Sequence, residues 1–377
     1  MKAINLFYLL VLPPVLMVTC GCSKPDVQLD TPSSYTIDWN AAADSSSRSL
    51  VNSFWNAGGA YFNTNNVSNT TFQYWPNGHA LDVLVDAYTR SKDAFYTNII
   101  NQWYAGVQAK NGNTFRNDYN DDMEWNAIAM LRAYQATNDA RYKDAALQVW
   151  EWIKLGWNSN AGGGIAWAKG YETSKNACSN GPACILAARL YQAFGDESNK
   201  EWATKIYDWE KSTLFNSNTG AVYDNINSST GAISNWIFTY NQGTFVGSAV
   251  ELYKITGDKG YLNDAILASN YTISTLVNSS LLKDEGNGDG GLFKGIFIRY
   301  FTELILQNGL DASAKNRYLQ FIKYNGETLW MQGTAKPAVL YGTFWGTKPG
   351  STVGVTEQLS GSMLIEAMAL LKNNGAL

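Results

Sequence analysis

The chain has 377 residues, a formal net charge of −4 and only 28 Lys and Arg residues, so it lacks the basic surface of a nucleic-acid-binding protein. Its one histidine, His79, excludes a three-histidine zinc site and any mechanism that needs two imidazoles. No G-x-S-x-G, P-loop or Rossmann glycine pattern occurs, which excludes the corresponding serine hydrolases and nucleotide-binding folds.

The N-terminus has the features of an export signal. Lys2 supplies a positive end, and an apolar run at residues 6–18 is too short to span a membrane as a mature helix. The run leads into V-T-C-G-C-S-K, which resembles a bacterial lipoprotein cleavage site. We expect Cys22 to carry the lipid. The alternatives are Cys20 and a plain secretory signal.

Similar strings then recur along the chain and mark the ends of helices. The landmark is a tyrosine in D-A-Y-T-R-S-K-D, R-A-Y-Q-A-T-N-D, R-L-Y-Q-A-F-G-D and E-L-Y-K-I-T-G-D, namely Tyr88, Tyr134, Tyr191 and Tyr253. Weaker copies place Ile305 and Leu371 at the equivalent position. The stretch before each landmark is apolar almost all round, as expected for a helix buried on every side.

The repeat predicts six helical hairpins, each with one buried and one surface helix. Examples of buried helices are 80–88, 125–134 and 244–253, and surface helices are expected at 41–54, 94–107, 142–155, 200–214 and 261–276. Six hairpins suit a closed (α/α)6 barrel, an all-α fold with little sheet, and an open helical solenoid is the alternative. We expect a signal at 1–22, a polar tether at 23–35 and a single (α/α)6 catalytic domain at 36–377.

The barrel also predicts which of its ends carries the chemistry. Connections before the buried helices are long, and long loops in a compact domain are usually functional. They contain Trp157, Trp167, Trp236 and Trp345. Positions twelve residues before the landmarks are equivalent in a ring and should converge on its axis. The predicted polar cup contains Asp121 and Asp122 with Trp75, His79, Trp125, Asn180, Asn241, Gln242 and Lys294.

The adjacent carboxyl groups of Asp121 and Asp122 are the candidate catalytic pair. Cleavage of a glycosidic bond usually needs two carboxyl groups of different protonation, and ionisation of one raises the pKa of the other. The abundance of aromatic residues, 14 Trp and 22 Tyr among them, suits uncharged sugars, although any single Trp can equally belong to the core. Helix capping is the structural alternative for the aspartates. Calcium binding is disfavoured because the segment lacks the glycine and terminal glutamate of an EF-hand.

Two cysteines lie outside the N-terminal segment, in C-S-N-G-P-A-C. Export permits a disulfide between Cys178 and Cys184, but no second pair completes a metal site. We expect two free, buried thiols.

From about residue 40 to the C-terminus the chain resembles glycoside hydrolase family 76. The resemblance is carried by N-D-D-M-E-W, Y-W-P-N-G-H-A-L-D, G-G-G-I-A-W, K-N-A-C-S-N-G-P, V-Y-D-N-I, Y-N-Q-G-T-F and F-K-G-I-F-I-R-Y. It implies an (α/α)6 barrel with retaining endo-α-1,6-mannanase activity, Asp121 as nucleophile and Asp122 as acid/base. Asp224 matches a further acidic position that binds or orients the sugar. Cys178 and Cys184 stand where other small residues are more usual, which affects the shape of the cup.

Three functions therefore stay open: a mannanase, a transglycosidase on mannose-containing glycans, and a non-catalytic glycan-binding surface lipoprotein. A lyase or uronyl hydrolase is disfavoured because a uronate needs cationic partners. We expect α-mannan or manno-oligosaccharide as the partner, no metal or cofactor, no nucleic acid, a monomer, and membrane attachment through the lipid anchor alone. That anchor places the protein in the cell envelope, at the outer membrane, the cell surface or the periplasmic face.

Overall fold

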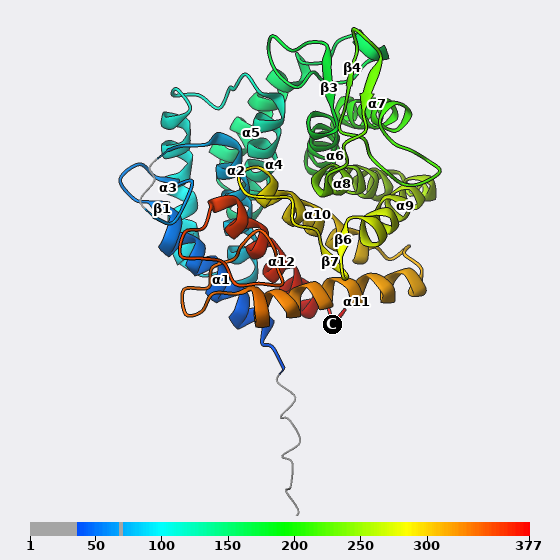
Figure 1. Cartoon of the computed structure of the whole chain (residues 1–377). Helices are drawn as coiled ribbons and strands as arrows, with labels where there is room; N and C mark the ends of the chain where they lie inside the picture. The colour runs from blue at the N-terminus through cyan, green and yellow to red at the C-terminus, as the bar shows by residue number, and fades with distance from the viewer. Residues whose placement is uncertain (1–35, 68–70) are drawn as a thin grey trace, which may run out of the picture. The chain divides into compact units, whose positions relative to one another are not determined.

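Long helices alternate along the chain between an inner and an outer ring (Figure 1). The computed structural model describes residues 36–67 and 71–377, so Cys22 and the predicted signal and tether lie outside the described residues. The inner helices are α2 (Tyr74–Ser91), α4 (Asn120–Thr137), α6 (Gly181–Phe194), α8 (Thr239–Thr256), α10 (Gly290–Ile305) and α12 (Val355–Asn373). The outer helices are α1 (Trp39–Phe54), α3 (Ala94–Lys110), α5 (Ala140–Lys154), α7 (Glu197–Thr213), α9 (Lys259–Thr275) and α11 (Ala312–Thr328).

The inner helices form a closed ring. Each contacts the next in chain order, and α12 returns to contact α2, with each outer helix against an inner one. The glycine at the start of α8 shows how close the packing is, because a Cβ on Gly243 would lie 2.6 Å from Cα of Phe297 on α10. The predicted (α/α)6 barrel is thereby confirmed, and the alternative of an open solenoid is wrong.

The repeated strings of the sequence are turns between an inner and an outer helix. At four of them the landmark tyrosine carbonyl accepts a hydrogen bond from a left-handed C-cap residue, Lys92, Asn138, Gly195 or Gly257. The next residue is an aspartate whose side chain caps the following outer helix, as Asp93, Asp139, Asp196 and Asp258 do. The same local chemistry therefore ends one helix and starts the next at each copy.

Strands are few and short, and they lie in the connections. β1 (Trp55–Asn56) pairs with β2 (Tyr61–Phe62), β3 (Ser174–Asn176) with β4 (Asn225–Asn227), β4 with β5 (Ala232–Ser234), and β6 (Val277–Asn278) with β7 (Leu281–Leu282), all antiparallel. The three-stranded sheet ties the loop before α6 to the loop before α8. Short helical turns complete the connections, 3-10 at Asn160–Gly162 and Ala177–Ser179 and π at Leu329–Gly333.

Buried amide side chains at the starts of four inner helices hold the preceding loops. Asn77, Asn180, Gln242 and Gln358 each bond to loop backbone. Asn180, for example, accepts from Ile165 N at 2.8 Å and donates to Ile165 O at 3.1 Å. These bonds fix the long loops against the helix ends and satisfy backbone groups that burial would leave unpaired.

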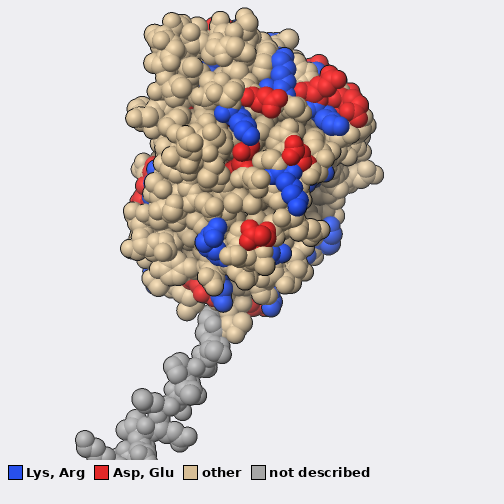
Figure 2. Space-filling view, turned by 90° about the vertical axis from the view of Figure 1, so that its right-hand side faces the viewer, with Lys and Arg blue, Asp and Glu red and all other residues tan. Residues whose placement is uncertain are grey.

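Charged side chains are sparse over the surface of the barrel. Figure 2 shows one side, with positive and negative groups interspersed and wide areas that carry neither. The described part of the chain contains no helix that is both long and apolar enough to cross a membrane.

Candidate active site

A cleft of 530 Å³ opens at the end of the barrel where the inner helices begin. Its walls come from the starts of α2, α4, α8 and α10 and from the loop before α6. They comprise Gln73, Trp75, Tyr119, Asp121, Asp122, Trp125, Trp167, Asn176, Cys178, Tyr240, Asp289 and Phe293. The structure thus brings Asp121, Asp122, Trp75 and Trp125 of the predicted cup into one hollow.

Both aspartates occupy the first turn of α4, and the N-cap of that helix is Tyr119 rather than either of them. Asp121 is enclosed by the loop before α6, where the thiol of Cys178 lies 3.3 Å from its Oδ2. Burial raises the pKa of Asp121 to about 6, against the opposing effects of the Cys178 thiol and the Trp167 indole. The group is therefore largely ionised at neutral pH.

Asp122 has a different environment. Burial raises its pKa well above the usual value, and the charges of Asp121 and Asp289 add to the shift. Its neighbour in the sequence is thus the better anion, and Asp122 is the better proton donor. Two adjacent carboxyl groups with pKa values pushed apart are what an acid and a nucleophile at one bond require.

Asp289 is a third carboxyl group in the cleft, and the sequence reasoning did not select it. It lies in the loop D-E-G-N-G-D-G-G, which reads as an ordinary glycine-rich turn. Its Oδ1 accepts a hydrogen bond of 3.2 Å from Trp75 Nε1. The sequence signal that identifies Asp289 is the position of its loop directly before α10, because α2, α4 and α8 also present cleft residues at their starts.

His79 lies behind the aromatic floor of the cleft rather than on its surface. The imidazole packs 4.6 Å from the ring centre of Trp125 and 5.5 Å from that of Trp75, and only 3% of the residue is exposed. Burial and the charge of Arg299 hold its pKa well below the usual value. A neutral imidazole at this place supports the two indoles.

Five other predicted site residues are also buried outside the cleft lining. Asn180 and Gln242 hold loop backbone as described. Asn241 donates to Asp224 Oδ1 at 2.9 Å, and Asp224 also accepts from Asn225, so this carboxylate is hydrogen-bonded behind the wall that Cys178 and Tyr240 form.

Lys294 is the fifth of these residues. Its Nζ is buried 5.4 Å from the ring centre of Trp345 and has no hydrogen-bond partner among the described residues. Burial lowers the pKa of Lys294 although Glu285, Asp284 and Glu357 oppose the shift. The amine of Lys294 therefore lies behind the cleft wall, close to the Trp345 indole and in the field of these three carboxyl groups.

Both remaining thiols are free and buried, as expected. Burial raises the pKa of Cys178 well above the usual value, with further contributions from Asp121 and Asp224. Cys178 is thus a neutral S–H donor to Asp121. Cys184 donates to the carbonyl of Ala203 at 3.3 Å, within the packing of α6 on α7.

Behind the aspartate pair lies an unpartnered buried acid, Glu124, one helical turn along α4. Both of its carboxyl oxygens, and both of those of Glu210 on α7, lack a hydrogen-bond partner among the described residues. Burial raises the pKa of each well above its usual value. Burial thus favours the neutral form of both groups beneath the cleft.

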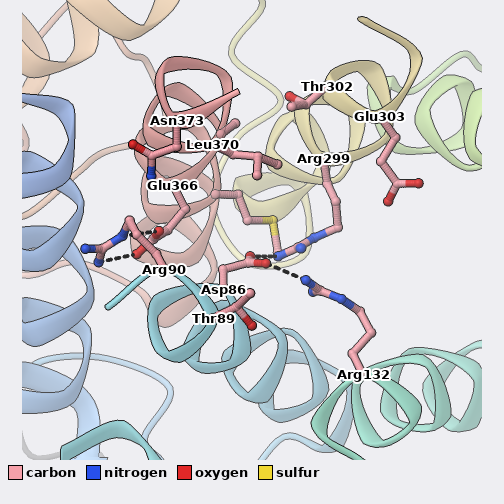
Figure 3. Close-up of a pocket in the computed structure, with 12 residues that line it drawn as sticks. Asp86, Thr89, Arg90, Arg132, Arg299, Thr302, Glu303, Glu366, Leu370 and Asn373 are labelled. Atoms are coloured by element: carbon pink, nitrogen blue, oxygen red, sulfur yellow. Dashed lines mark hydrogen bonds and ion pairs between the residues drawn. The ribbon is translucent and has the colours of Figure 1, made fainter. Parts of the chain in front are cut away.

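A second cavity, of 330 Å³, lies at the opposite end of the inner ring (Figure 3). There Arg132 and Arg299 both reach Asp86, at 2.6 and 2.8 Å, and Arg299 also lies 3.0 Å from Asp82. Although burial acts in the other direction, Arg132 and Arg299 hold the pKa of Asp82 below its usual value. Each acid that lines this cavity, namely Asp86, Glu303 or Glu366, is paired with an arginine, unlike the carboxyl groups of the cleft.

The described residues contain no group of three or more His, Cys, Asp and Glu side chains placed to hold a metal ion. The side chains that line the cleft supply carboxyl groups, aromatic rings, amides and one thiol.

Residues 38–376 match the sequence model of glycosyl hydrolase family 76. Among solved structures, the α-1,6-mannanase GH76A from Salegentibacter sp. HEL1_6 is 44% identical, covers 89% of this chain and 100% of its own, and superposes with a TM-score of 0.86. Inactive variants of that enzyme, each changed at two consecutive aspartates, were solved with α-1,6-mannotriose and α-1,6-mannotetrose.

Curated relatives from yeasts are more distant. Mannan endo-1,6-alpha-mannosidase DCW1 of Candida glabrata is 26% identical over 277 residues, which are 64% of this chain and 60% of that protein. The corresponding protein of Saccharomyces cerevisiae is 26% identical over 221 residues, which are 53% of this chain and 49% of that protein. The chain thus spans about half to three-fifths of the length of these two relatives.

Proposed function

This chain belongs to glycosyl hydrolase family 76, and we propose that it hydrolyses α-1,6-mannosidic bonds within mannan backbones, with Asp121 as the nucleophile and Asp122 as the acid and base. The observation that carries the proposal is the shared cleft in which two adjacent carboxyl groups differ in protonation. The mannanase from Salegentibacter, 44% identical, supports the choice of linkage.

In the first step the proton of Asp122 passes to the glycosidic oxygen as the bond to the leaving sugar breaks. Asp121 attacks the anomeric carbon and forms a covalent glycosyl ester. In the second step Asp122, now a carboxylate, takes a proton from water, whose oxygen attacks the same carbon and releases Asp121. Two displacements retain the configuration.

The remaining walls of the cleft fit a neutral sugar chain. No Lys or Arg belongs to the cleft lining in the described part of the chain, so a uronate would find no cation there. Trp75, Trp125 and Trp167 offer apolar faces to pyranose rings, and Asn176 and Gln73 offer hydrogen bonds. Trp75, Trp125 and Asp289 are the residues that we propose contact the substrate beside the aspartates.

The second candidate activity is transglycosylation, because the glycosyl ester can react with a sugar hydroxyl instead of water. A binding-only role is disfavoured by the protonation difference between Asp121 and Asp122, since binding needs no such pair.

The test uses the full chain and debranched α-1,6-mannan. We expect short manno-oligosaccharides with many intermediate sizes, as an endo-acting enzyme gives, and a product anomer that NMR identifies as α before mutarotation. Asp121→Ala and Asp122→Ala should each abolish product release while helical circular dichroism stays unchanged. Products longer than a mannotetraose substrate would identify transglycosylation, and full activity in either variant would refute the assignment.

We further propose that Cys22 carries a lipid and that the protein is a monomer held in the cell envelope. The first helix begins at the end of the barrel away from the cleft, where Asn40 on α1 bonds to Asn373 at the end of α12, at 3.0 Å. An anchor joined there would leave the cleft accessible to mannan. Release of Cys22→Ala, but not Cys20→Ala, from the membrane fraction would support this proposal, and retention of both would refute it.

A further inference from the structure

A run of aromatic rings leads out of the cleft on the α8 side. Tyr240 and Phe293, which line the cleft, stack with their ring centres 3.9 Å apart. Phe238 follows at 5.4 Å from Phe293, and Trp236 at 6.4 Å from Phe238. The run therefore continues the aromatic wall of the cleft to a point beyond it.

Trp236 is unusual among the tryptophans of the described residues because 65% of it is exposed. Trp103, Trp150 and Trp345, by contrast, are fully buried. Single exposed apolar residues need no explanation, but an exposed indole that continues a functional cleft marks a binding surface. In the described part of the chain its indole N–H has no hydrogen-bond partner, so ring and N–H are both available to a ligand.

Three hydrogen bonds hold the backbone of the segment that carries Trp236. Its carbonyl accepts from Asp224 N at 3.0 Å, and the next carbonyl, of Ile237, accepts from Lys283 Nζ at 3.1 Å. The segment then enters α8, where Thr239 N donates to Glu285 at 2.9 Å. The indole is thus presented from a fixed position, which lowers the entropic cost of binding.

We propose that Trp236 forms an outer sugar-binding position that takes a mannosyl residue of a chain running out of the cleft past Phe238. The inference rests on the proposed function and extends its substrate from short oligosaccharides to polymer. A sugar fits better than a second copy of the chain or another protein. A stable protein interface buries about 800 Å² on each partner, far more than one indole and its neighbour provide.

An outer position changes how strongly long chains bind without touching the reacting bond. A polymer can occupy the cleft and Trp236 at once, whereas a short oligosaccharide that fills the cleft gains nothing from the indole. The ratio of KM for α-1,6-mannotetraose to KM for mannan should therefore be high in the wild type.

The experiment measures this ratio for the wild type and the variants Trp236→Ala, Trp236→Phe and Tyr324→Ala. Tyr324, 46% exposed on α11, is a matched surface aromatic that does not belong to the cleft lining. We expect Trp236→Ala to raise KM for debranched mannan roughly tenfold relative to KM for mannotetraose, from lost apolar burial, with kcat on the polymer retained. Trp236→Phe should recover part of the effect, and Tyr324→Ala should behave as wild type.

Affinity electrophoresis in gels that contain mannan provides an activity-independent reading. If Trp236→Ala leaves KM for mannan and the retardation unchanged, or changes both substrates equally, the inference is overturned while the proposed function stands. If the wild type is retarded but cleaves nothing, and Trp236→Ala reduces the retardation, the inference is supported and the proposed function fails. A wild type that neither cleaves nor binds mannan overturns both.

Discussion

Cys178 is expected to set the acidic limit of activity through its contact with Asp121. The thiol is neutral and lies 3.3 Å from the carboxylate, so it stabilises the ionised form of Asp121. A thiol is a weak donor, and its loss from a charged acceptor should cost about 0.7 kcal/mol, or roughly half a pKa unit. A nucleophile must be ionised, so kcat/KM falls as pH drops through the pKa of Asp121, about 6.

Two replacements at this position should move that limit in opposite directions. Cys178→Ala removes the donor, so the limit shifts to higher pH and kcat/KM at pH 5 falls about threefold. Cys178→Ser supplies a stronger O–H donor and shifts the limit to lower pH. The assay is the pH dependence of kcat/KM on mannan from pH 4 to 9.

The control is Cys184→Ala, which removes an equally buried thiol that donates to Ala203 instead. Its pH profile should match that of the wild type even if its stability changes. The reasoning fails if the alanine and serine variants at 178 move the limit in the same direction, or if neither moves it.

Three further outcomes follow from the other carboxyl groups. Asp122→Asn should lower kcat on mannan by about 10²–10⁴-fold with mannan binding kept in affinity gels, because only general acid and base catalysis is removed; a smaller loss contradicts its role. Burial raises the pKa of Glu210 well above its usual value, so its contribution to stability is complete at acid pH and declines as pH rises above the pKa of the unfolded chain. Glu210→Gln should therefore stabilise the protein by roughly 1–3 kcal/mol at pH 7.5 and by less at pH 4, measured as Tm; an equal gain at both pH values contradicts this. Arg299→Met deprives Asp82 and Asp86 of a partner and should lower the free energy of unfolding by about 3–5 kcal/mol in urea titrations, whereas an unchanged midpoint would refute the importance of that pairing.

The fold was predictable because it is built from a local signal that repeats. The left-handed C-cap and the aspartate N-cap occur within six residues at each of four turns, so the strings R-A-Y-Q-A-T-N-D and E-L-Y-K-I-T-G-D carry the whole turn. Helix starts were less visible. Inner helices were expected from 80, 125 and 244 but begin at 74, 120 and 239, because polar residues of the cleft end interrupt the apolar pattern.

The sequence predicts how far along each inner helix the site residues lie, but not which side chains face the cleft. The twelve-residue spacing leads to Asn241 and to Phe293, with Lys294 beside the latter. Phe293 lines the cleft, but Tyr240 lines it in place of Asn241, and Lys294 does not. Successive helix residues point about 100° apart, and no spacing rule tells which one faces the axis. Asn180 and Gln242 were selected for their polarity, and the structure uses that polarity to hold loop backbone.

The two ends of the inner ring differ in whether cations pair with their buried carboxyl groups. This difference identifies the catalytic end of the barrel better than the shapes of the two cavities do. At the far end Asp82 and Glu303 are paired with cations that, against the effect of burial, hold their pKa values below the usual range. At the cleft no cation faces Asp121, Asp122 or Asp289 from the lining, so burial raises the pKa values of Asp121 and Asp122, and the charge of Asp121 raises that of Asp122 further. A carboxyl group whose pKa is lowered by a cation stays ionised near neutral pH, whereas one whose pKa is raised by burial can hold a proton there. The paired carboxylates at the far end therefore stabilise the ring, whereas the carboxyl groups of the cleft have no cationic partner in the lining and are available for catalysis.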